Sequence, residues 1–176
     1  MIENVSVSDA HSLRKTFLDK FTTKSVPQYR SVMGHGDFYG VNGHKGFLWE
    51  IIRPYKVISE KIALEIVSQK DEIFVMWDRP LRGTNRELQK TRMIKTSGLC
   101  LVNNIKPFAD EREMLFRLIG SNFYVFDREM SFHVTFTGEN LSGFGRICIT
   151  SIENLENDGV SPVFREIFEH YGLGKL

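Results

Sequence analysis

Three short runs of β-prone residues follow one another in the second half of the chain, and they constrain the fold more than any other feature. They cover residues 123–126, 132–137 and 145–151, which are rich in aromatic and β-branched side chains. The connections DREMS and GENLSGF have the length of hairpin loops. Because so short a connection joins antiparallel strands, the sequence predicts three antiparallel neighbours in one sheet.

Amphipathic helices are predicted before and after that run. In residues 9–22, Leu13, Phe17 and Phe21 recur every four positions, which is the spacing of one helix face. Residues 110–119 begin with a capping box, an arrangement that supplies hydrogen-bond acceptors to the free N–H groups of the first turn. Residues 161–171 begin with a serine and a proline and carry an apolar stripe. We therefore expect three amphipathic helices.

Residues 55–70 fit two patterns. As a helix, the segment is capped by Ser59 and has one apolar face, made of Ile62, Ala63, Ile66 and Val67. As a strand, it shows an alternation that is almost as good, at Ile58, Ile62, Leu64 and Ile66. We favour the helix because four apolar positions share one face. Strands are predicted at residues 73–77 and around residues 99–102.

The mixture of helices and antiparallel strands indicates the α+β class. A chain of 176 residues, of which 41% are apolar, is long enough for one domain with a substantial core. We expect a single α+β domain over residues 1–176, with a mostly antiparallel sheet and amphipathic helices packed on one face. The other face of the sheet would then be open to a ligand or a partner.

Charge and cysteine content exclude several classes of protein. The formal net charge is +1, so no global field favours nucleic acid or a membrane surface. The first residues lack a basic start followed by an apolar run, and no apolar stretch approaches the ~20 residues of a membrane span. Cys100 and Cys148 form no CxxC motif and lie in apolar segments that are predicted to be strands. We expect a soluble cytoplasmic protein without a cofactor, either a monomer or a homodimer.

The glycine-rich stretch MGHGDFYGVNGHKGF, residues 33–47, has two interpretations. Its glycine spacing does not match a phosphate-binding loop, and a turn rather than a helix follows it. A metal site would use His35, Asp37 and His44, with a further ligand from His133 or Asp127. The dipeptide Asn-Gly between two β-prone runs is typical of a two-residue hairpin turn, and we favour that interpretation.

His133 is a second candidate for chemistry. It shares one face of a predicted strand with Thr135 and Thr137, and the opposite face is apolar. With Asp127 a hairpin away, the imidazole is a candidate general acid or base, because it titrates near neutral pH. A histidine beside threonines on a strand is more typical of a solvated sheet face, and we favour that placement.

The stretch RPLRGTNRELQKTRMIK is strongly basic. It carries six cations against one acid, Glu87; the cations are Arg79, Arg82, Arg86, Lys90, Arg92 and Lys95. No aromatic residue is interleaved for base stacking, and no nucleic-acid-binding motif is present. A solvated loop is the favoured interpretation, followed by a site for an acidic protein partner, and last by binding to a phosphate backbone.

The functional hypothesis that these observations favour is a small protein-binding module that masks or inhibits a partner and has no catalysis of its own. Tryptophan, tyrosine and arginine carry most of the binding energy at protein interfaces. The predicted interface residues are therefore Arg79, Arg82, Arg86, Arg92, Trp49 and Tyr39, with Tyr55 and Trp77 as further candidates. The alternative is a small metal-dependent or His/Asp acid–base enzyme, or a ligand-binding domain, centred on His35, Asp37, His44, His133 and Asp127.

Overall fold

The computed structural model describes residues 1–26, 29–33, 48–53, 55–77, 86–105, 122–141 and 145–155. Within these residues, seven strands form one antiparallel sheet in the order β1-β4-β3-β5-β6-β7-β2. The strands are β1 (Glu3–Asn4), β2 (Lys56–Ser59), β3 (Ile73–Trp77), β4 (Met93–Thr96), β5 (Phe123–Phe126), β6 (His133–Leu141) and β7 (Gly145–Thr150). The predicted α+β class is confirmed.

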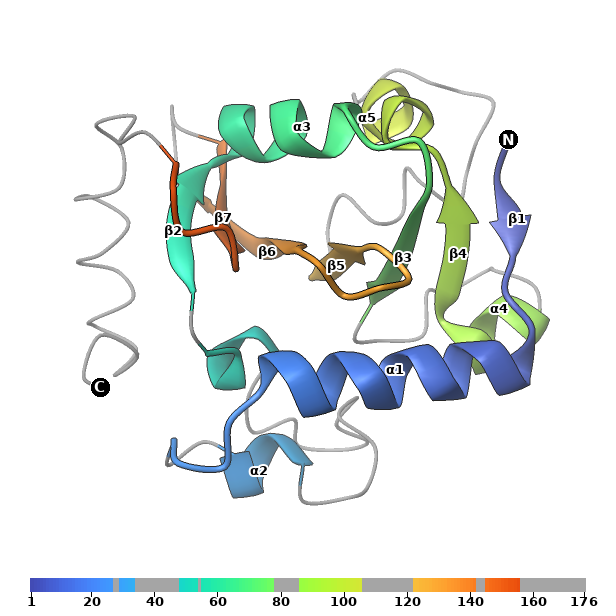
Figure 1. Cartoon of the computed structure of the whole chain (residues 1–176), viewed down its shortest axis with the longest axis horizontal. Coiled ribbons are helices and arrows are strands. Elements are labelled where there is room, and N and C mark those ends of the chain that lie inside the picture. The colour runs from blue at the N-terminus through green and yellow to red at the C-terminus, as the bar shows by residue number, and fades with distance from the viewer. Residues whose placement is uncertain are drawn as a thin grey trace.

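Helices cover both faces of the sheet (Figure 1). The long helix α1 (Val7–Phe21) crosses one face, while α3 (Glu60–Ser68) and α5 (Gly98–Ile105) cover the other. Three shorter elements lie outside these layers: α2 (Tyr29–Met33), α4 (Arg86–Thr91) and the single 3₁₀ turn η1 (Leu48–Ile51).

The expectation that helices pack on only one face was wrong, and the strand β3 shows why. All five of its residues are buried, and they alternate between two cores. Phe74 and Met76 belong to the core under α1, whereas Ile73, Val75 and Trp77 belong to the core under α3 and α5. A strand that is apolar at every position must be covered on both faces, so the sheet needs two helical layers.

The helix α1 forms much as its periodicity predicts. It begins two residues earlier than expected because Ser6 caps it, accepting a hydrogen bond from the N–H of Asp9 at 3.1 Å. Four residues of one face are buried: Ala10, Leu13, Phe17 and Phe21. The segment after the helix pairs with η1, through the bridge between Thr22 and Ile52.

The helical interpretation of residues 59–68 is confirmed. Ser59 caps α3 by accepting a hydrogen bond from the N–H of Ile62 at 3.3 Å, and Ala63 and Val67 are buried. The four residues before the helix form β2, an edge strand that pairs with β7 and that the sequence pattern did not reveal. The prediction of a strand at residues 73–77 is also confirmed.

The prediction of a strand around residues 99–102 is wrong, because this segment lies in the helix α5. Ser97 caps the helix by accepting a hydrogen bond from the N–H of Cys100 at 3.2 Å, and the buried residues Leu101 and Ile105 are four apart. The β-structure lies just before it, in β4. Cys100 is therefore on a helix, while Cys148 is on β7 as predicted.

Gly98 sets the contact between the two helices on this face. Its N–H donates to the carbonyl of Lys70 at 2.8 Å, just beyond the end of α3. A Cβ at this position would stand 1.7 Å from the carbonyl oxygen of Val67. A residue with a side chain therefore cannot occupy position 98 unless α5 moves away from α3.

The three strands predicted in series are confirmed as β5, β6 and β7, and they are antiparallel neighbours. In register, Val125 pairs with Val134, and Thr135 pairs with Ile149. The strand β6 extends further than expected, with an irregularity between Phe136 and Asn140. The predicted helices at 110–119 and 161–171 and the predicted hairpin at 34–47 lie outside the described residues.

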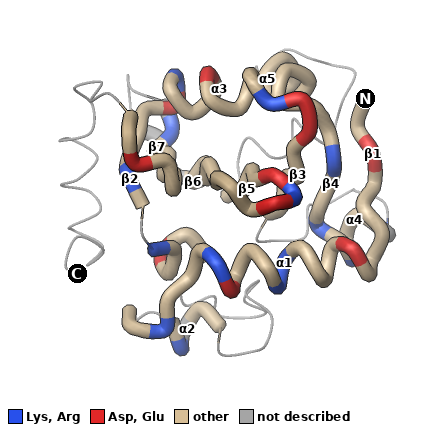
Figure 2. The backbone as a smooth tube through the Cα atoms, viewed as in Figure 1, with Lys and Arg blue, Asp and Glu red and all other residues tan. Residues whose placement is uncertain are grey.

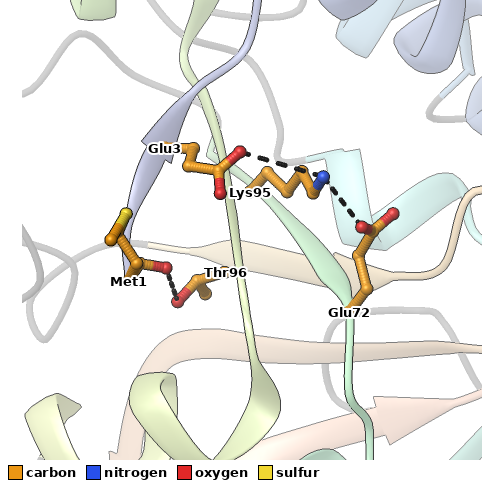
Figure 3. A network of polar contacts seen from close by, with 5 residues as sticks. All are labelled: Met1, Glu3, Glu72, Lys95 and Thr96. Atoms are coloured by element: carbon orange, nitrogen blue, oxygen red, sulfur yellow. Dashed lines mark hydrogen bonds and ion pairs between the residues drawn. The ribbon is translucent and has the colours of Figure 1, made fainter.

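A polar network holds the short strand β1 at one edge of the sheet (Figure 3). The ammonium group of Lys95 on β4 lies 2.8 Å from a carboxylate oxygen of Glu72 and 3.8 Å from one of Glu3. The hydrogen bond that Lys95 donates to Glu72 is the main reason why the pKa of Lys95 is raised. Thr96 donates a hydrogen bond to the carbonyl of Met1 at 3.1 Å. The side chain of Lys95 is thus directed to acids of its own chain.

Candidate functional site

His133 is fully buried beneath α1, and the expectation of a solvated position was wrong. Its ring centroid lies 4.7 Å from that of Phe21 and 6.0 Å from that of Phe17, both in edge-on geometry. The alternation of the strand was read correctly, since His133 and Thr135 do lie on the face opposite Val134. The face of β6 that carries His133 is shielded from solvent because α1 covers it.

The imidazole of His133 is held by few polar contacts. Its Nδ1 lies 3.3 Å from the hydroxyl oxygen of Thr135, and its Nε2 has no hydrogen-bond partner within the described part of the chain. The strand beneath it is well anchored, because the N–H of His133 donates to Ser151 Oγ at 2.9 Å and its carbonyl accepts from Thr150 Oγ1 at 2.6 Å. Burial lowers the pKa of His133 to about 3. The ring is therefore neutral at physiological pH and closed to solvent.

Asp127 has a structural position in the turn between β5 and β6. Its carboxylate accepts hydrogen bonds from the N–H of Ser131 at 2.6 Å and from the hydroxyl of Ser131. Met130 in the same turn has a positive φ of 53°. Among the described contacts, none joins Asp127 to His133, so these two members of the predicted acid–base set are not brought together.

Most of the residues proposed as metal ligands lie outside the described ranges. No group of three His, Cys, Asp or Glu side chains among the described residues is arranged to hold a metal ion. His35, Asp37 and His44 all lie in the segment 34–47, outside those residues. Their role as ligands stays a prediction.

The aromatic residues proposed for an interface are mostly buried. Trp49 is part of the core under α1, and its backbone N–H donates to the phenolic oxygen of Tyr124 at 3.1 Å. Trp77 is fully buried on β3. Tyr55 is half-buried and stacks under the guanidinium of Arg53, 4.8 Å from the ring centroid. Tyr39 lies outside the described residues. The placement of Trp49 and Trp77 offers no surface to a partner.

The cations of the basic stretch do not all lie together. Arg86 and Lys90 are exposed on α4, Arg92 is half-buried just after it, and Lys95 reaches its acids at the sheet edge. From the other side, Arg14 of α1 donates to the carbonyl of Thr91 at 2.5 Å. We call the four residues Arg14, Arg86, Lys90 and Arg92 the basic corner. Figure 2 marks the Lys and Arg residues along the backbone in blue and the Asp and Glu residues in red. Arg79 and Arg82 lie outside the described residues.

The backbone of Arg92 is unusual. Its φ is 48°, in the left-handed region, where glycine or asparagine is the common residue. Its N–H donates to the carbonyl of Leu88 at 2.8 Å and so ends α4, and its carbonyl accepts from the N–H of Trp77 at 3.2 Å. The basic corner is thereby joined to the central strand β3 by backbone hydrogen bonds.

The helices differ in charge. The helices α1, α2 and α4 carry six cations against three acids, while α3 and α5 carry one cation against two acids. Arg14 and the positive φ at position 92 were not part of the sequence-based hypothesis. The role of Arg14 depends on the tertiary contact between α1 and α4. The positive φ at position 92 could not be predicted, because an arginine stands after α4 where a glycine would have indicated a left-handed residue.

A small hollow lies at the opposite edge of the sheet. It has a volume of about 230 Å³ and is lined by Tyr55, Lys56, Ser151 and Glu153. The ammonium group of Lys56 already donates to the carbonyls of Glu153, at 3.5 Å, and of Leu155. Because ligand pockets usually measure roughly 300–1,000 Å³, this hollow is small for a ligand-binding site, and its cation is already used.

No helix in the described part of the chain has the length and apolar character needed to cross a membrane. Comparison of the chain with protein-family models, with curated proteins and with solved structures finds no match.

Proposed function

We propose that this chain is a small protein-binding module that recognises an acidic segment of a partner protein through the basic corner. The observation that carries the proposal is that Arg14 of α1 bonds to the end of α4, the helix and turn that carry Arg86, Lys90 and Arg92. In the sequence, only the basic stretch RPLRGTNRELQKTRMIK indicates this region. The contribution of Arg14 adds a second element to it.

The rigidity of the corner supports binding. The hydrogen bond from Arg14 to the carbonyl of Thr91 ties α1 to α4, so the guanidinium of Arg14 is held at the end of the helix that carries Arg86 and Lys90. A site whose charges are already positioned loses less conformational entropy when a partner binds. Arginine is also well suited to carboxylates, because its planar guanidinium can donate two parallel hydrogen bonds.

The backbone of Arg92 gives independent support. A left-handed conformation costs an ordinary residue about 1–2 kcal/mol, a cost that glycine does not carry. The chain nevertheless places an arginine at this position. Retaining a long cationic side chain where glycine would relieve strain is consistent with a role for that side chain in binding.

The charge of the surroundings favours an acidic partner. The helices α1, α2 and α4 together carry an excess of cations, whereas α3 and α5 do not. Such a distribution accelerates association with a negatively charged surface and makes binding sensitive to salt. Catalysis finds less support, since His133 is sealed in the core and Asp127 is bonded within its turn.

The proposal is tested with a labelled poly-glutamate peptide as the probe. Lys90 on α4 and Lys61 on α3 are both exposed lysines in helices, so Lys90→Glu and Lys61→Glu form a matched pair on opposite layers. We expect Lys90→Glu to weaken binding about tenfold at low salt, and Lys61→Glu to leave it nearly unchanged. Equal losses in the two variants, or no binding of the peptide by the unmodified protein at low salt, would contradict the proposal.

Two further measurements sharpen the result. The variant Arg92→Gly suits the backbone at φ 48°, so we expect it to keep the stability within about 1 kcal/mol while it weakens peptide binding. Duplex DNA serves as a second probe. If DNA binds more tightly than the peptide and Lys90→Glu removes that binding, the phosphate-backbone alternative replaces the acidic protein partner.

A further inference from the structure

The core under α1 contains a group that the proposed function does not use. Among the described residues, His133 is the one buried side chain that ordinarily changes charge between pH 3 and pH 8. It lies on β6, and its ring contacts Phe17 and Phe21 of α1, so it forms part of the surface on which that helix docks. Its charge state therefore bears directly on one of the two helical layers.

We propose that the docking of α1 on the sheet is the acid-labile contact of this fold: a proton taken up by His133 releases α1, while the layer of α3 and α5 stays packed. This inference goes beyond the proposed function and does not depend on it.

Among the described residues, no negative group is placed to stabilise a charged imidazole of His133. From α1, the ammonium group of Lys20 lies 5.9 Å from the ring centroid of Phe21. From the turn before β6, the guanidinium of Arg128 lies 5.1 Å from the ring centroid of Phe74, in the same core. Both are cations, so neither can act as a counter-ion to an imidazolium.

The remaining described elements around His133 contribute neutral groups and one further cation, Arg53. Tyr124 on β5 accepts a hydrogen bond from the N–H of Trp49, and Thr150 and Ser151 on β7 bind the backbone of His133. Arg53, after η1, donates its N–H to the carbonyl of Phe21, and its guanidinium lies over Tyr55. An imidazolium in this core would be desolvated without a described counter-charge, so protonation requires that the ring reach water.

The opposite layer has different chemistry. Its buried ionisable groups are the thiol of Cys148 and the guanidinium of Arg146. Burial raises the pKa of the Cys148 thiol and lowers that of the Arg146 guanidinium. Thiols and guanidinium groups titrate on the alkaline side of neutral, so neither group is expected to change charge in mildly acidic solution. The half-buried carboxylate of Glu60 accepts a hydrogen bond from the N–H of Arg146 at 3.1 Å.

Hydrogen exchange of the full chain, measured between pH 7 and pH 4 and corrected for intrinsic rates, tests the proposal. Uptake of one proton on opening makes the opening equilibrium about tenfold more favourable per pH unit below the normal pKa of histidine. We expect the protection of α1 amides to fall by about this factor for each pH unit, while the protection of α3 amides changes much less. Loss of protection in both helices with the same pH dependence would overturn the proposal.

Three variants isolate the imidazole. His133→Phe and His133→Gln remove the titrating group, and both are expected to flatten the pH dependence of α1 protection. His11→Gln is the matched control, because His11 lies on the exposed face of the same helix, and it is expected to leave that dependence unchanged. A slope that persists in His133→Gln contradicts the proposal. If neither His133 variant folds, the proposal is still tested in the unmodified protein by comparing how the amide protection of α1 and of α3 depends on pH.

Discussion

The two faces of the sheet are built differently, although the same strands supply both. Under α1, aromatic rings meet at centroid distances of 5.0–6.1 Å, and the set comprises Phe17, Phe21, Phe74, Tyr124 and Phe126. That core also encloses the imidazole of His133. Under α3 and α5, two helices approach closely at Gly98 and cover a core with more aliphatic residues.

The difference teaches that each layer has its own weak point. The α1 layer depends on keeping one imidazole neutral, because that ring has no counter-charge among the described residues. The α3–α5 layer depends on the absence of a side chain at position 98. Arg14 of the basic corner lies on α1, so the proposed binding surface and the acid-labile contact share this helix. Changes that affect one layer and spare the other are the direct test of this contrast.

The largest effect is expected from Gly98→Ala. The new Cβ would overlap the carbonyl oxygen of Val67, so α5 must separate from α3 or the chain must rearrange. Overpacking against backbone costs about 3 kcal/mol or more, and urea unfolding followed by circular dichroism measures it. The neighbouring change Leu99→Ala is the control, because that side chain is 58% exposed. Equal stabilities of the two variants would mean that the helix contact is not tight.

A smaller effect is expected from acid. The folded state binds the proton of His133 less readily than the unfolded state, since burial lowers its pKa to about 3. Above pH 6.5 neither state binds it, and stability is unaffected by this group. Below pH 6.5 only the unfolded state binds it, so the free energy of unfolding falls by about 1.4 kcal/mol per pH unit until the folded-state pKa is reached.

Urea unfolding at pH 6.5 and pH 5 measures this change, which amounts to about 2 kcal/mol from His133 alone. In His133→Gln the decrease over the same range should be smaller by that amount. A decrease of the same size in the variant would assign the acid sensitivity to other groups, of which Glu60 is the first to examine.

The smallest effect is expected at the sheet edge, which belongs to neither layer. Lys95→Met removes the ion pairs to Glu72 and Glu3 in Figure 3. Because these pairs are solvent-exposed, we expect the free energy of unfolding to change little, and less still at high salt. A large loss of stability would contradict this expectation, because it would mean that the ion pairs of Lys95 stabilise β1 more than exposed ion pairs usually do.

Much of the fold could be predicted because local signals agreed with the tertiary structure. Ser59 before a run with one apolar face predicted α3, and hairpin-length loops predicted β5, β6 and β7 as antiparallel neighbours. The failure at α5 has a physical cause. Its sequence GLCLVNNI is short and mostly apolar, and an apolar run of this length fits a buried strand as well as a helix.

The candidate site was less predictable than the fold. Exposed cations on α4 follow from composition, but Arg14 joins them only through the packing of α1 on α4. The expected catalytic residues that the structure describes proved to be core and turn residues. Pattern alone places His133 on one face of its strand, and a sequence carries no direct sign of whether that face is covered.

The sequence by itself determined the elements whose signals are local: the capped helix α1, the capped helix α3 and the strands β3, β5, β6 and β7. Caps, periodicity and hairpin lengths act between residues a few positions apart, so they can be read without knowing the fold. The tertiary structure decided which faces are dry, that Trp49 and His133 are buried, and that Arg14 meets α4. Those outcomes depend on which layer packs on which, and contacts between distant segments set them.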